Sequence, residues 1–194
     1  RKTIRHCQYW KGVKKNSKTE TFFACKLFID NKRWKDIPFF IRTGKRLPTK
    51  VTEIVVKFKK NNNIFSSKSA RNTLIFRLQP DEGLLVKFNL KKPGNKSEII
   101  NKNLEFHYKK LGDNIISNAY ETLILDVFKG DTMLFSRSDF VEKAWKIVDP
   151  ISKEIKSNNI KLYGYKAGTW GPQKSNNLFR NKNTWRYPCK NLVN

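Results

Sequence analysis

The sequence predicts an α+β domain in which a large, mainly antiparallel sheet has helices packed on one of its faces. Strand-like alternation fills the first half of the chain, and two amphipathic helical stretches follow it. Turn residues separate two neighbouring strand segments, which favours antiparallel pairing. With 194 residues, the chain has the length of one ordinary domain, and we expect a single core over residues 1–194.

Three segments, residues 54–59, 74–79 and 84–91, alternate apolar and mainly polar side chains with the period of a strand. The residues predicted to form the apolar face are Ile54, Val56 and Phe58; Leu74, Phe76 and Leu78; and Leu84, Val86, Phe88 and Leu90. The turn residues at 80–83 predict a hairpin between the second and third segments. Residues 21–30 are apolar on both sides, which predicts a more buried strand.

Two later segments repeat apolar residues at helical spacing. The first follows a capping-box pattern at 118–121 and ends at Gly130, with Tyr120, Leu123, Ile124, Val127 and Phe128 on its apolar stripe. The second begins at Ser138 or Asp139, and its stripe consists of Val141, Ala144, Trp145 and Val148. Pro150 should break or kink this second helix. We expect both stripes to belong to the core.

The chain is strongly basic, with 41 Lys and Arg against 16 Asp and Glu, a net charge of +25. Such a charge is compatible with a basic RNA-binding domain, which is one hypothesis for its function. The lysines are spread along the chain and often lie beside asparagine, rather than gathering on one element. We therefore attribute the charge to the composition that an AT-rich genome imposes, and expect no nucleic-acid partner.

Several other classes of protein are disfavoured. No apolar run reaches the ~20 residues of a membrane-spanning helix, so no membrane association is expected. The residues Cys7, Cys25 and Cys189, with His6 and His107, show no metal-ligand spacing, and we expect no metal; the cysteines fit a reducing, cytoplasmic compartment. Gly44-Lys45 lacks the remainder of a P-loop, and no Gly-rich dinucleotide fingerprint follows any strand.

One stretch is highly specific: residues 37–53 read IPFFIRTGKRLPTKVTE. It closely resembles the signature of the carboxy-terminal domain of the glucose-6-phosphate dehydrogenases, and of the bacterial members most of all. Further blocks that resemble this domain follow the family order at residues 19–22, 30–34, 77–83, 119–121, 135–139, 142–145 and 167–172.

The resemblance implies a role in the oxidation of glucose 6-phosphate to 6-phosphogluconolactone by NADP, in the pentose phosphate pathway. In that family an amino-terminal Rossmann domain holds the coenzyme and the general base. We expect that domain to be absent from this chain, which should therefore contain no catalytic residue and be inactive alone. The resemblance also implies that the sheet forms the interface of a homo-oligomer, either a dimer or a tetramer.

The resemblance assigns site residues one by one. Lys45 and Lys50 match the two cationic positions that contact the sugar phosphate, and Gln79 matches a glutamine near the substrate in some members. Arg42, Arg77 and Lys87 match positions that bind a second, structural NADP in some relatives. Two other basic positions of those relatives are Val51 and Val55 here, and the tail around Trp185 and Tyr187 aligns poorly. These departures argue against a structural NADP site.

Three hypotheses are open on the sequence: part of an NADP-dependent dehydrogenase, a degenerate dimerisation or regulatory subunit without activity, and an RNA-binding domain. The family motifs favour the first. Preference for NAD or NADP, and the choice between dimer and tetramer, are not specified by these residues.

Overall fold

A computed structural model describes residues 17, 19–60, 70–94, 98–111, 119–157, 161–179 and 184–188. The cap position Asn118, together with His6, Cys7 and Cys189, lies outside these ranges. The strands are β1 (Phe22–Leu27), β2 (Phe39–Gly44), β3 (Thr52–Lys57), β4 (Thr73–Gln79), β5 (Gly83–Lys91) and β6 (Ile99–His107). The helices are α1 (Ala119–Lys129) and α2 (Ser138–Lys156), with short 3-10 turns η2 (Tyr108–Lys110) and η3 (Gln173–Leu178).

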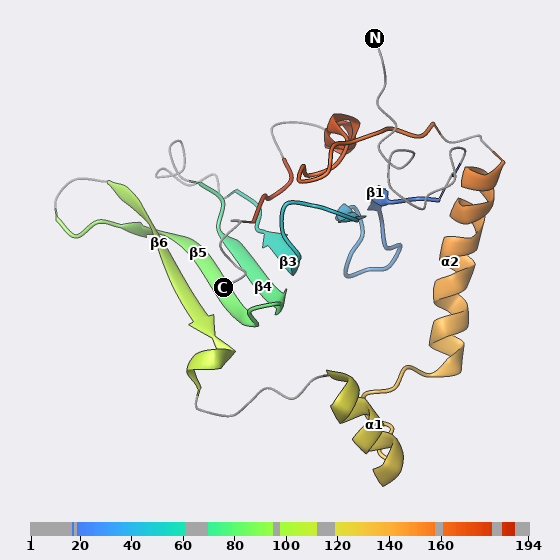
Figure 1. The fold of residues 1–194 in the computed structure, drawn as a ribbon. Helices are drawn as coiled ribbons and strands as arrows, with labels where there is room; N and C mark the ends of the chain where they lie inside the picture. The colour runs from blue at the N-terminus through green and yellow to red at the C-terminus, as the bar shows by residue number, and fades with distance from the viewer. Residues whose placement is uncertain are drawn as a thin grey trace.

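The strands form two antiparallel sheets, which confirms the predicted α+β class (Figure 1). Strands β1 and β2 make a two-stranded sheet, and β3, β4, β5 and β6 pair in chain order in a four-stranded sheet. The predicted hairpin is confirmed, since β4 pairs with β5 antiparallel. The single large sheet of the prediction is divided into these two sheets, and the loop at 45–51 connects β2 of one to β3 of the other.

The four-stranded sheet has one almost entirely apolar face. Cross-strand pairs place Ile54 beside Phe76, Phe76 beside Leu84, and Leu84 beside Phe106. We call this surface the apolar sheet face; its members are Ile54, Val56, Leu74, Phe76, Leu78, Leu84, Val86, Phe88, Leu90, Ile100, Leu104 and Phe106. Much of this face is open to solvent, since Phe76 is 40% exposed and Leu104 63% exposed.

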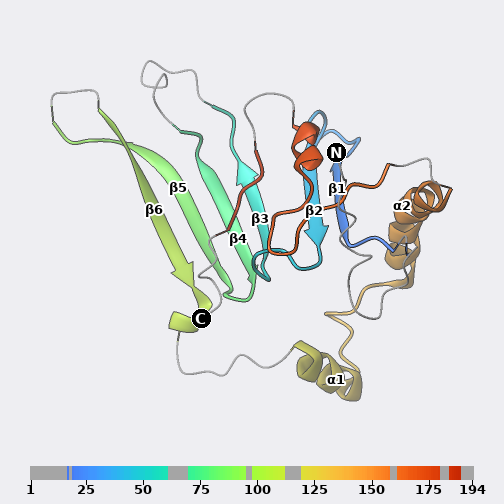
Figure 2. The same cartoon turned by 45° about the horizontal axis from the view of Figure 1, so that its top comes forward.

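The opposite face of the same sheet contains the most buried side chains among the described residues. Ile75 and Leu85 are nearly inaccessible, and Arg77 is only 9% exposed. The C-terminal segment Thr184–Pro188, which we call the tail strap, runs over this face at β3 (Figure 2). Lys57 Nζ donates to the Thr184 carbonyl at 3.1 Å, and Arg186 pairs with Glu53. The core therefore lies under the strap, on the face that contains the charged residues.

An aromatic cluster joins the strap to the small sheet. Phe40 of β2 stacks on Phe179 with ring centroids 4.3 Å apart, and Trp185 packs edge-on against both rings. The indole N–H of Trp185 donates to the Ser175 carbonyl in η3 at 3.3 Å. The strap and η3 thus hold the end of the chain against β2 as well as β3.

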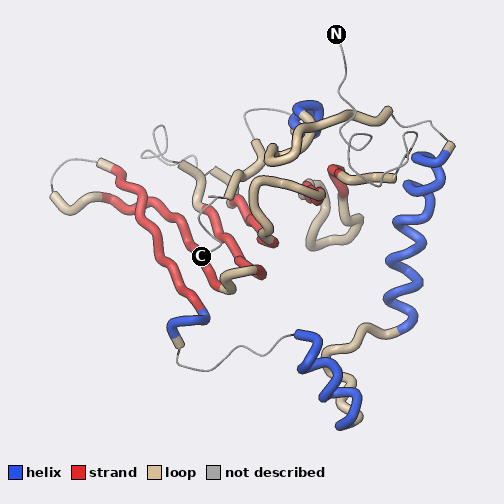
Figure 3. Tube along the Cα trace, viewed as in Figure 1, coloured by secondary structure: helices blue, strands red, loops and turns tan. Residues whose placement is uncertain are grey.

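The helices lie away from the four-stranded sheet, on the side of the β1–β2 sheet (Figure 3). The expected packing of their apolar stripes on the sheet was wrong: Phe128 of α1 is 85% exposed, and Trp145 of α2 is also exposed. Gly130 ends α1 as predicted, in a left-handed conformation (φ +69°) that glycine adopts without strain. Pro150 does not break α2, which continues to Lys156. None of the helices in the described ranges combines the length and apolar character of a membrane span.

Candidate functional site

The first candidate site is the loop between β2 and β3, residues 45–51, where Lys45 and Lys50 are both exposed. The loop begins at Lys45, whose backbone N–H donates to the Thr21 carbonyl at 2.8 Å. Arg46 follows in a left-handed conformation (φ +51°), and its carbonyl accepts the N–H of Gly168 at 2.9 Å. The backbone that carries Lys45 is therefore fixed by hydrogen bonds from two distant parts of the chain.

Gln79, the third residue assigned to the substrate, lies at the end of β4 next to this loop. Its Cα partner in the sheet is Thr52, two residues after Lys50, and its side chain is exposed. The Gln79–Pro80 peptide bond is cis. The structure thus brings the Lys50 end of the loop and Gln79 to the same end of the four-stranded sheet.

The guanidinium of Arg42 lies among three aromatic rings. Its distances to the ring centroids of Trp170, Trp185 and Tyr187 are 4.9, 4.8 and 5.3 Å. Its Nη2 donates to the Arg186 carbonyl in the tail strap at 2.9 Å. Burial lowers the pKa of Arg42, and the nearby Tyr187 and Glu53 oppose that shift. Arg42 therefore anchors the strap through cation–π contacts and a hydrogen bond.

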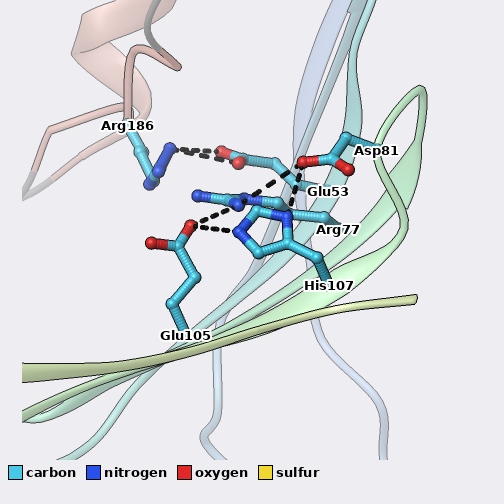
Figure 4. Close-up of polar contacts among 6 residues, drawn as sticks. All are labelled: Glu53, Arg77, Asp81, Glu105, His107 and Arg186. Carbon is cyan, nitrogen blue, oxygen red and sulfur yellow. Dashed lines mark hydrogen bonds and ion pairs between the residues drawn. The ribbon is translucent and has the colours of Figure 1, made fainter. Parts of the chain in front are cut away.

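A network of charged side chains lies on the buried face of the sheet (Figure 4). Arg77 Nη1 is 2.5 Å from Glu105 Oε1 and 3.9 Å from Asp81 Oδ2. The two nitrogens of His107 face the same two carboxylates, with Nδ1 2.8 Å from Asp81 Oδ2 and Nε2 3.3 Å from Glu105 Oε1. The network links β4 to β6 and compensates the burial of Arg77 with two carboxylates.

Glu53 joins this network to the tail strap. Arg186 Nη1 donates to its two carboxylate oxygens at 3.1 and 3.2 Å. Burial raises the pKa of Glu53, and the positive charges of Arg186, Arg77, Arg42 and Lys87 oppose the shift. Three of these charges, Arg42, Arg77 and Lys87, belong to the residues assigned to a structural coenzyme.

The residues assigned to a structural coenzyme and those assigned to the substrate differ in how far their side chains are engaged within the protein. Arg42 and Arg77 are engaged by the strap, the aromatic rings and the carboxylates, whereas Lys87 is exposed. For Lys45 and Lys50, no hydrogen bond or ion pair of the ammonium group is seen within the described ranges. No cluster of three or more metal-ligating side chains is found in that part of the chain either.

Sequence reasoning missed three residues that shape these sites: Tyr165, Glu53 and Arg186. Tyr165 lies two residues before the family block at 167–172, and its hydroxyl is 2.8 Å from the carbonyl oxygens of both Thr21 and Lys45. Glu53 ends the signature stretch, but nothing in its spacing indicates a partner in the tail. Only the fold brings Arg186, 133 residues later, into contact with it.

The chain is similar to several known proteins. The family model described as "Glucose-6-phosphate dehydrogenase, C-terminal domain" matches residues 2–186. The chain is 46% identical over 180 residues to a glucose-6-phosphate 1-dehydrogenase of Aggregatibacter actinomycetemcomitans, covering 92% of this chain and 36% of the relative. It is 42% identical over 189 residues to that of Treponema pallidum, covering 94% of this chain and 37% of the relative.

Two solved structures have the same fold. The glucose-6-phosphate 1-dehydrogenase of Mycobacterium avium superposes with a TM-score of 0.77 at 30% identity, covering 92% of this chain and 38% of that one. A glucose-6-phosphate dehydrogenase in complex with its substrate glucose-6-phosphate gives 0.76 at 31% identity, over 84% of this chain and 34% of that one. The chain spans less than two-fifths of the length of each of these four proteins. It belongs to the glucose-6-phosphate dehydrogenase family and contains that family's C-terminal domain.

Proposed function

We propose that this chain is the substrate-binding and dimer-forming part of an NADP-dependent glucose-6-phosphate dehydrogenase. The complete enzyme oxidises glucose 6-phosphate to 6-phosphogluconolactone in the cytoplasm. The observation that carries this proposal is the loop at 45–51, which exposes Lys45 and Lys50 and is fixed at its Lys45 end by backbone hydrogen bonds, in a chain of this family. Catalytic residues and the main NADP site belong, in this proposal, to the amino-terminal Rossmann domain of the complete enzyme.

The chemistry of the loop suits a sugar phosphate. An ammonium group donates up to three hydrogen bonds and attracts a phosphate dianion, and its compact shape also allows contact with neighbouring hydroxyls. Both lysines are exposed and carry no internal ion pair within the described residues, so their charges are available to a ligand. Gln79, at the adjoining strand end, adds an amide that can accept and donate hydrogen bonds to sugar hydroxyls.

We do not extend the proposal to a second, structural NADP. Arg42 and Arg77 have internal partners, and a phosphate would have to displace carboxylates and aromatic rings to reach them. Val51 and Val55 stand at two other positions where relatives with such a site are basic, and neither can bind an anion. Lys87 alone is exposed, and a single ammonium is a weak anion site.

The apolar sheet face supports the proposal of a homodimer. A continuous apolar surface that extends over four strands and is partly exposed is unusual on a monomeric protein. A second copy of the same face is a natural cover for it, because a two-fold axis makes an apolar surface complementary to itself. We expect an interface of ~2,000 Å² or more, the size of obligate dimers.

The experiment is an activity assay of the complete enzyme. Formation of NADPH is followed with glucose 6-phosphate, and with glucose at the same concentration as the control without a phosphate. Reduction that requires the phosphate supports the proposal. A folded, dimeric protein that forms no NADPH would favour the degenerate dimerisation subunit instead, and salt-sensitive binding of single-stranded RNA without activity would favour the basic RNA-binding domain.

A further inference from the structure

The hydroxyl of Tyr165 lies between two backbone carbonyls, one next to the start of β1 and the other next to the end of β2. Its oxygen is 2.8 Å from the carbonyl oxygen of Thr21, just before β1, and 2.8 Å from that of Lys45, just after β2. The Thr21 carbonyl also accepts the backbone N–H of Lys45 at 2.8 Å. One phenol therefore completes the junction at which β1 begins and β2 ends, and that junction includes the backbone of Lys45.

The residues after Tyr165 hold the same junction in place. The N–H of Gly168 donates to the Arg46 carbonyl at 2.9 Å, so the residue after Lys45 is also fixed. Phe22 packs against Tyr165 with ring centroids 5.5 Å apart, and its ring fills the space beside Gly171 where a Cβ would lie. The block at 165–171 thus contacts the start of β1 and the first two residues of the loop.

We propose that Tyr165 is a positioning residue for Lys45 in the recognition of the sugar phosphate. The inference rests on the proposed role of Lys45 as a substrate ligand. Tyr165 does not touch the ligand in this account; it fixes the peptide on which the Lys45 side chain is mounted. The block at 167–172, which the family resemblance singled out without a role, is then the scaffold of the substrate loop.

The physical reason is that Lys45 is exposed and its own side chain has no internal partner in the described ranges. Among the described residues, only its own backbone restricts where the ammonium group points. Without the phenol hydroxyl, the Lys45 carbonyl loses this donor, while the hydrogen bonds of the Lys45 N–H to Thr21 and of the Gly168 N–H to Arg46 are retained. The loop would then become ordered only when the substrate binds, and the free energy of this ordering would weaken binding. The Michaelis constant should therefore rise, while the chemical step is affected less.

The test is a double-mutant cycle in the complete enzyme, with Tyr165→Phe, Lys45→Ala and the double variant. Tyr165→Phe removes the hydroxyl and keeps the ring on Phe22, so the packing of the junction is retained. We expect KM for glucose 6-phosphate to rise about three- to tenfold, with kcat and the Kd for NADP nearly unchanged. In the Lys45→Ala background the same change should have almost no further effect, because the positioned group is absent.

Tyr163→Phe is the matched control, since Tyr163 is exposed and lies two residues away in the same segment. It should leave KM unchanged. Equal effects of Tyr165→Phe in both backgrounds, or no effect on KM while Lys45→Ala has a large one, would overturn the positioning role and leave the function of Lys45 intact. A Lys45→Ala variant with normal KM would overturn the substrate role of the lysine, and the positioning role with it.

Discussion

Replacing Phe76 with Glu should abolish the proposed dimer. Phe76 lies in the middle of the apolar sheet face, with Ile54 and Leu84 as its cross-strand neighbours. It is 40% exposed. Since a Phe side chain buries roughly 200 Å², about 80 Å² of it is available to a partner. At ~25 cal/mol per Å² this corresponds to about 2 kcal/mol for each copy, and about 4 kcal/mol for a two-fold dimer.

A loss of about 4 kcal/mol weakens the dimer roughly a thousandfold, and two buried carboxylates would weaken it further. Sedimentation velocity over a dilution series should show a dimer for the unchanged protein and a monomer for Phe76→Glu. Asn103→Glu is the control, because Asn103 pairs with Lys87 on the opposite face of the sheet and is exposed. The reasoning is refuted if the unchanged protein is a monomer while folded, or if Phe76→Glu dimerises as tightly as Asn103→Glu.

Two further predictions concern stability. Because burial raises the pKa of Glu53 above its ordinary value of 4.5, the folded state binds this proton more tightly than the unfolded state. Urea denaturation should therefore show that the free energy of unfolding of the unchanged protein, relative to that of Glu53→Gln, falls as the pH rises from 4.5 through the raised pKa. If the unchanged protein instead gains stability relative to Glu53→Gln as the pH rises, the raised pKa is contradicted. Gly171→Ala should lower the free energy of unfolding by roughly 1–3 kcal/mol more than Gly168→Ala, because both glycines have positive φ but only the Gly171 Cβ would overlap the Phe22 ring. Equal thermal midpoints for the two variants would show that Phe22 moves aside.

The strands could be predicted because alternation is a local property of the sequence. Residues 74–79 and 84–91 lie in β4 and β5, and the turn between them forms the predicted hairpin. Alternation identifies which residues share a face, but it does not say which face the rest of the chain covers. Phe76 and Leu78 of the predicted apolar face are exposed, whereas Arg77 is buried and pairs with Glu105 of β6 and with Asp81 in the turn after β4.

The helices show a similar division between local and long-range information. Gly130 ends α1 as its conformational freedom predicts. The apolar stripes of α1 and α2 were assigned to the core on their spacing alone, yet Phe128 and Trp145 find no cover in the described part of the chain. Pro150 deprives the helix of one backbone donor only, and α2 continues past it for six residues, to Lys156.

The loop at 45–51 was proposed as a substrate site from the family signature, but the contacts of Tyr165 that fix its start could not be predicted. Lys45 and Lys50 lie within one continuous motif, so a single sequence is enough to locate them. Tyr165 is 120 residues away from Lys45, and its hydroxyl reaches that backbone only because β1 and β2 pair and the later segment crosses their junction. The contact of the tail strap with β3 could not be predicted for the same reason, since Arg186 and Glu53 are 133 residues apart in the sequence.

The central claim, that Lys45 and Lys50 bind the sugar phosphate, is tested most directly by the specificity constant for glucose 6-phosphate in the complete enzyme. Lys45→Ala and Lys50→Ala should each lower it about ten- to hundredfold, the loss of roughly 1.5–3 kcal/mol of charge-assisted hydrogen bonding, while the Kd for NADP stays the same. Lys50→Arg should be milder than Lys50→Ala, whereas Lys45→Arg should be harmful, because a planar guanidinium does not reproduce a compact ammonium. Lys59→Ala, at an exposed residue just beyond β3, should behave as the unchanged enzyme. Equal, small effects at Lys45, Lys50 and Lys59 would contradict the claim.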